Sequence, residues 1–186
     1  AVTDELPGFV AMSPVALPRG KIANWGNSFL PGAYAGSYVN LQKMKPDAIL
    51  RDLKNSSLSK PEQRKQADLL SKLNNIHLER LERDQHLESG IQAMEMAFRM
   101  QFSVPDAFDV TKESKATQEL YGDSHYGKGC LIARRLVERG VRVVQLSHSI
   151  SGYDIAWDTG HGDIKGGHAD LAHASDQGIA ALLKDL

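Results

Sequence analysis

Residues that could bind a metal ion are concentrated near the C-terminal end of the sequence. Four of the seven histidines lie within the last 39 residues, namely His148, His161, His168 and His173. The same stretch contains Asp154, Asp158, Asp163, Asp170 and Asp176. Imidazole nitrogens and carboxylate oxygens are both ligands of divalent metal ions. This region is therefore the first candidate for a metal site.

Asp158 and His161 have the most suggestive spacing. They are three residues apart in the segment Trp157-Asp158-Thr159-Gly160-His161-Gly162-Asp163, and glycines allow the tight turn that brings two such side chains toward one cation. A catalytic zinc normally has three protein ligands, so two residues do not complete a site. The alternative is that Asp158 caps a loop and that His161 is an exposed loop histidine.

The other histidines suit several roles. His148 comes just after an expected strand and could be a metal ligand, a general acid, or a strand-end residue bonded to a backbone carbonyl. We expect the last of these. His168 and His173 are five residues apart and do not share a helix face, so we expect surface or capping roles.

Other chemistries find little support in the sequence. The triplet Asp158-Thr159-Gly160 matches aspartic proteases, but it occurs once in a chain with long helical segments, and that chemistry needs two carboxylates. Cys130 lies in an apolar helical context and is expected in the core. Neither a Walker spacing nor a dinucleotide-binding fingerprint is present.

The elements around these residues predict an α/β scaffold. We expect a helix over 126–139, a left-handed Gly140 and then a β-branched strand over 141–146, which together form one αβ unit. Because ligands bind beyond the carboxyl ends of such strands, the Asp158 loop follows the strand at the expected place. A final helix from about His168 is expected to pack on the sheet.

The remaining elements are less regular. Residues 1–40 predict one short strand followed by a long, packed but irregular segment. A short helix is expected from Lys115 to Tyr121. Residues 59–102 predict two helices, the first opened by a capping box of Ser59 and Glu62. We therefore expect a largely helical insertion over 41–120 within the scaffold.

Composition excludes several classes of protein. The chain has 186 residues, 41% hydrophobic and 24% charged, with a net charge of −1 and one cysteine. Basic and acidic residues balance in every part of the sequence, so nucleic acid is not an expected partner. No apolar stretch is long enough for a membrane span, and the N-terminal residues lack the pattern of a signal peptide.

Several separated motifs resemble a known family, the sulfatase-like domain of unknown function 1501. They are Leu6-Pro7-Gly8-Phe9-Val10, Phe29-Leu30-Pro31-Gly32, Leu87-Glu88-Ser89-Gly90-Ile91, Met96-Ala97-Phe98-Arg99-Met100-Gln101, Ala133-Arg134-Arg135-Leu136-Val137-Glu138-Arg139-Gly140-Val141-Arg142, Trp157-Asp158 and Asp176-Gln177-Gly178-Ile179-Ala180-Ala181-Leu182-Leu183. The family is similar to the alkaline phosphatase superfamily. The resemblance covers nearly the whole chain, and it implies that residues 1–186 are part of one alkaline-phosphatase-like domain with a layered sheet.

The resemblance also implies a function. Asp158 and His161 would be ligands of a divalent metal ion, zinc or calcium, and 176–183 the supporting helix. The chain would belong to a metal-dependent hydrolase of sulfate or phosphate esters, acting on a small molecule or glycan outside the cytoplasm. The nucleophile and remaining ligands are expected outside residues 1–186, so these residues alone should be inactive. The alternative is a non-catalytic exported relative with a structural or glycan-binding role.

Overall fold

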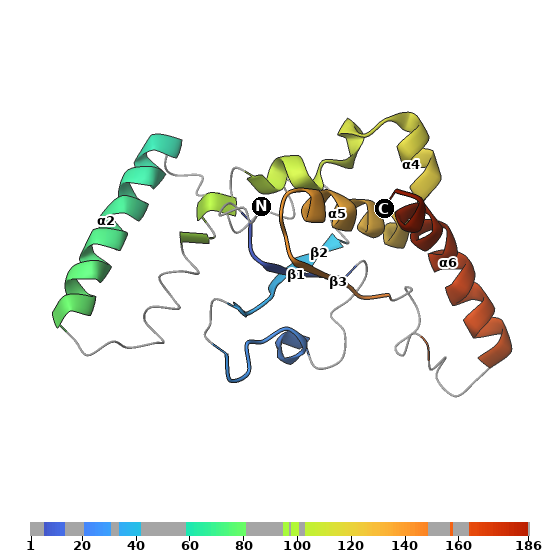
Figure 1. The fold of residues 1–186 in the computed structure, drawn as a ribbon, viewed down its shortest axis with the longest axis horizontal. Helices are drawn as coiled ribbons and strands as arrows, with labels where there is room; N and C mark the ends of the chain where they lie inside the picture. Colours follow the sequence, from blue (N-terminus) through green and yellow to red (C-terminus); the bar gives the residue numbers. More distant parts are fainter. Residues whose placement is uncertain are drawn as a thin grey trace.

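A small parallel sheet lies at the centre of the computed structural model (Figure 1). The structure describes residues 6–13, 21–30, 34–41, 59–80, 95–96, 98–100, 103–148, 157 and 164–185. The strands are β1 (Phe9–Ser13), β2 (Ser37–Asn40) and β3 (Val143–Leu146), in the order β2-β1-β3. Both pairs are parallel, with Met12 opposite Val39 on one side and Leu146 on the other. The chain is therefore a mixed α/β protein, as the sequence predicts.

The sequence did not predict β2, which lies in the segment expected to be irregular. Its residues, Ser-Tyr-Val-Asn, include two with low strand propensity. Packing fixes this strand instead. The ring of Tyr38 stacks on Trp25 at 4.8 Å, and Gly36 leads into the strand where a Cβ would come within 2.9 Å of the ring of Phe9.

One face of the sheet forms the main core. Val10 and Met12 of β1 are buried against Ile132 and Leu136 of helix α5 (His125–Glu138), and Phe108 joins the same cluster. Alternate residues of a strand point to opposite faces, so Val10 and Met12 share the face that α5 covers. Burial of these apolar side chains is the main favourable term that holds α5 on the sheet.

The turn from α5 into β3 sets the direction of the helix. Gly140 has φ +92°, its N–H donates to the carbonyl of Val137 at 2.9 Å, and the N–H of Val141 donates to Leu136 at 3.1 Å. This is the left-handed helix end that the sequence predicts. The chain reverses here, so α5 is antiparallel to β3 and begins at the carboxyl edge of the sheet.

Two further helices lie beside α5 (Figure 1). They are α4 (Lys115–Tyr121) and α6 (Ile164–Asp185), and both contact α5. A Cβ on Gly178 of α6 would meet the Cα of Gly127 at 2.9 Å, so the two helices touch closely there. The α6 helix was expected on the sheet, but its principal contacts are with α4 and α5.

Charged side chains fix the C-terminal half of α5 to its neighbours. Arg135 is buried and donates Nε to the carbonyl of Ala107 at 3.0 Å and Nη2 to that of Asp106 at 2.7 Å. Its Nη1 bonds to Glu113. Arg134 bridges Glu113 at 2.8 Å and Asp185 at the end of α6 at 2.7 Å. We call these residues the arginine network.

Helix α2 (Lys60–Arg80) stands apart from the sheet and the other labelled helices in Figure 1. One of the two bonds of the predicted capping box is present, because the backbone N–H of Ser59 donates to the Glu62 carboxylate at 2.8 Å; the Ser59 hydroxyl also donates to this carboxylate. The expected apolar stripe is at least half exposed at Leu69, Leu73 and Ile76. Most of the second expected helix lies outside the described residues, and an insertion over 41–120 stays a prediction. No helix among the described residues is long and apolar enough to cross a membrane.

Candidate functional site

The three strands end together at one edge of the sheet, which we call the carboxyl edge. The N–H of Ser147 donates to the carbonyl of Met12 at 2.9 Å, so the chain leaving β3 stays beside β1. Ser13 at the end of β1 is fully buried. Burial raises the pKa of Tyr38 on β2. Sites in open parallel sheets lie beyond this kind of edge.

His148 is the first histidine beyond β3 at the carboxyl edge. Its ring meets Tyr126, in the first turn of α5, edge-on at 4.7 Å and an interplanar angle of 80°. The Nδ1 atom is buried and has no hydrogen-bond partner among the described residues. Burial lowers the pKa of His148, which favours the neutral imidazole near pH 7. A neutral ring can accept a proton or bind a metal ion.

A row of four rings continues from His148 along the carboxyl edge. Trp157 lies 5.5 Å from His148 and 5.8 Å from His168 of α6, measured between ring centroids. Nε2 of His168 lies 2.6 Å from the carbonyl oxygen of Trp157. We call Tyr126, His148, Trp157 and His168 the ring row. It connects the start of α5, the end of β3 and the N-terminal part of α6.

The expected metal ligands can be compared with this geometry only in part. Asp158 and His161 both lie outside the described residues. His173, Asp170 and Asp176 are exposed on α6. Among the residues that the structure describes, no three His, Cys, Asp or Glu side chains come together as a metal site. The ligand assignment therefore stays a prediction.

Two side-chain assignments are clearer. Cys130 is buried in the core, where burial raises the pKa of its thiol to about 11. The thiol is thus protonated near neutral pH, which agrees with the predicted core role. His168 bonds to a backbone carbonyl, as expected of a capping or surface residue.

The ring row could not be predicted from the sequence. Tyr126 follows the helix cap Ser124, whose hydroxyl accepts from the N–H of Gly127 at 2.9 Å. That cap predicts the start of α5. It does not show which loop residue would contact the side chain of Tyr126. The pairing of His148 with Trp157 is a tertiary contact, so spacing alone could not show it.

A comparison with protein families gives one match, to the model described as "Protein of unknown function (DUF1501)", over residues 1–186. The chain belongs to this family. Neither the curated proteins nor the solved structures contain a match to it. The description of DUF1501 states no activity. The residues at the carboxyl edge are therefore the basis for a proposed function of this DUF1501 chain.

Proposed function

We propose that this DUF1501 chain is part of a metal-dependent hydrolase of sulfate or phosphate esters, related to the alkaline phosphatase superfamily. The observation that carries the proposal is the buried Nδ1 of His148 at the carboxyl edge, which has no hydrogen-bond partner among the described residues. A buried polar atom without a partner is uncommon, and a ligand is one explanation for it. The parallel sheet with α5 on one face is compatible with the layered fold of that superfamily.

The chemistry of the donor set suits a metal ion. Asp158 and His161 are the proposed ligands, and His148 is the described residue best suited to join them. Imidazole nitrogen with carboxylate oxygen is typical of zinc, whereas calcium takes oxygen ligands. We therefore favour zinc over calcium. When bound, such an ion polarises the ester and stabilises negative charge on the transferring group.

Three described residues, His148, Tyr126 and Trp157, would position and support a metal ion at this site. Burial keeps the ring of His148 neutral, so that its nitrogen lone pair is available near pH 7. Tyr126 and Trp157 contact the His148 ring and limit its orientation. Trp157 directly precedes Asp158 in the sequence. The proposed substrate is a small-molecule or glycan ester, and the proposed location is outside the cytoplasm.

Hydrolysis assays with the natively expressed protein test this function. Aryl sulfate and aryl phosphate esters would be compared before and after chelation, and again after zinc is restored. We expect one ester to be hydrolysed, chelation to abolish the activity and Asp158→Ala to lower it at least about 100-fold. Asp170→Ala, an exposed carboxylate on α6, is the matched control. Full activity in Asp158→Ala would contradict the proposal.

A second candidate is a non-catalytic glycan-binding role. Trp157 is 48% exposed, and exposed aromatic side chains with one polar end are common at binding surfaces. Glycan binding that survives chelation but is lost in Trp157→Ala would favour this role. Glycan binding that chelation abolishes would favour the hydrolase.

A further inference from the structure

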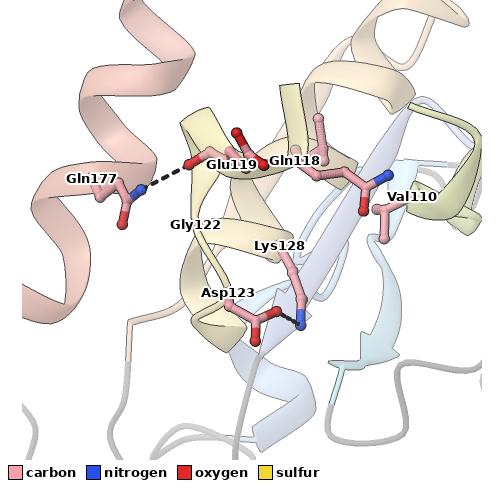
Figure 2. A pocket seen from close by; sticks show the side chains of 8 residues that line it. Val110, Gln118, Glu119, Gly122, Asp123, Lys128 and Gln177 are labelled. Atoms are coloured by element: carbon pink, nitrogen blue, oxygen red, sulfur yellow. Dashed lines mark hydrogen bonds and ion pairs between the residues drawn. The ribbon is translucent and has the colours of Figure 1, made fainter. Parts of the chain in front are cut away.

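A cavity lies between α4, the start of α5 and α6 (Figure 2). Its volume is about 430 Å³, which is within the range of small-molecule sites. Val110 and Leu131 supply apolar surface, and Leu131 is part of the core. We call this cavity the α4–α6 pocket. It contains none of the proposed metal ligands and no member of the ring row.

Two glutamine amides in the pocket wall have fixed orientations. Nε2 of Gln177 donates to the backbone carbonyl of Glu119 at 3.0 Å, an interaction drawn in Figure 2. Nε2 of Gln118 donates to the carbonyl of Glu113 at 2.8 Å. Because the amide nitrogens are engaged with the backbone, the amide oxygens remain as acceptors for a ligand.

Gly122 makes room for one of these amides. It ends α4 with φ +77°, and a Cβ there would lie 2.4 Å from Oε1 of Gln177. Any other residue would therefore strain the backbone and displace the Gln177 amide. Gly122 therefore both ends α4 and leaves space for the Gln177 amide in the pocket wall.

The charges in the pocket are mainly negative. Glu119 and Asp123 are the acidic residues, and Lys128 the basic residue, among the residues that line the pocket. Nζ of Lys128 pairs with Oδ1 of Asp123 at 2.5 Å, but the Asp123 side chain is 98% exposed. Exposed ion pairs of this kind are weak. The pocket therefore offers more acceptors and negative charge than donors.

We propose that the α4–α6 pocket binds a small organic ammonium ion with a short aliphatic body. An ammonium group carries three donors and no acceptor, which complements the amide oxygens and the Glu119 carboxylate. The aliphatic part would contact Val110 and Leu131. Polyamines and free lysine share this chemistry. The proposal does not rest on the hydrolase function, because the two sites have no residue in common.

A titration followed by NMR would test the chemistry of the ligand. Isotope-labelled protein would be titrated with n-butylammonium, 1-butanol and butyrate, which share one aliphatic body. We expect butylammonium to shift the Gly122 amide and the side-chain amide signals of Gln118 and Gln177, with a dissociation constant on the order of millimolar. Equal binding of 1-butanol, or no shift with butylammonium, would overturn the proposal. Further arms with 1,4-diaminobutane and lysine distinguish a polyamine from an amino acid.

Charge variants make the test sharper. Glu119→Gln removes an attractive charge and should weaken butylammonium binding about 3- to 10-fold. Lys128→Gln removes the competing cation and should strengthen binding by a similar factor. Asp170→Asn on α6 is the control, since it changes the net charge equally but does not line the pocket. Circular dichroism would confirm that each variant is folded. Equal effects of Glu119→Gln and Asp170→Asn would reject a specific site.

Discussion

The two ends of α5 differ in how their polar groups are satisfied. At the C-terminal end, the arginine network pairs Arg134 and Arg135 with carboxylates and backbone carbonyls. Nε of Arg134 makes no hydrogen bond among the described residues, but it still lies 3.3 Å from a carboxylate oxygen of Glu138. At the N-terminal end, Tyr126 meets the half-buried ring of His148, whose Nδ1 has no partner among the described residues. Paired charges fix a helix in place, whereas an unpartnered buried atom marks a place where function can reside.

Removing Arg135 should have the largest effect on stability. Arg135→Met leaves Glu113 and the carbonyls of Ala107 and Asp106 without this donor, and the loss of one partner from a buried charged network costs about 3–5 kcal/mol. Urea unfolding would measure the free energy. Arg142→Met, at an exposed position after the helix, should change it by less than about 0.5 kcal/mol. Similar free energies of unfolding for both variants would show that the arginine network does not stabilise the C-terminal end of α5.

The contact between α5 and α6 should be next in size. Gly178→Ala places a methyl group 2.9 Å from the Cα of Gly127, and a backbone atom cannot yield easily. We expect a loss of about 1–3 kcal/mol in the free energy of unfolding. The matched control is Gly8→Ala, where a Cβ meets nothing within 4 Å. If Gly178→Ala were as stable as Gly8→Ala, the close helix contact would be refuted.

A smaller effect should appear in acid at the C-terminal end. Hydrogen bonds from Lys112 and Arg139 lower the pKa of Asp106 from 3.8 to about 2. A lowered carboxyl pKa stabilises the fold above the unfolded value, so this contribution is lost as the pH falls from about 3.8 toward 2. The unfolding midpoint would be measured as a function of pH. It should change less with pH in Asp106→Asn than in the unmodified protein. A profile as steep as that of the unmodified protein would show that Asp106 does not contribute to the loss of stability in acid.

The N-terminal end should instead respond near neutral pH. Burial lowers the pKa of His148 from its ordinary 6.5, so its protonation destabilises the fold as the pH falls below about 6.5. Proton NMR of the imidazole signals in the metal-free protein should give a midpoint below 6.5 for His148. The signal is assigned by its loss in His148→Gln. A midpoint at or above 6.5 would show that the ring is not buried in this way.

Local signals explain why much of the scaffold was predictable. Ser114 and Ser124 cap α4 and α5, and Gly122 and Gly140 end them with positive φ. Each is a short-range requirement of the backbone that one residue type meets. The strand β2 was missed because its burial, including the Trp25 stack, depends on distant parts of the chain.

The candidate site was less predictable for the same reason. The sequence favoured a strand-end His148 bonded to a backbone carbonyl. The described residues show such a bond for His168, whereas Nδ1 of His148 has no partner among them. The bond from His168 to a carbonyl depends on the packing of α6 against Trp157. Such packing is a tertiary contact that sequence spacing does not specify. The spacing of Asp158 and His161 indicates a shared cation but does not supply the third ligand.

The most direct test of the proposed metal site is the metal content of the natively expressed protein. Elemental analysis would compare the unmodified protein with Asp158→Ala, His161→Ala and Asp170→Ala, after unfolding measurements confirm that all are folded. We expect about one zinc ion per chain in the unmodified protein and in Asp170→Ala, and little in the other two. Metal content that is unchanged in Asp158→Ala and His161→Ala, or absent from the unmodified protein, would contradict the account.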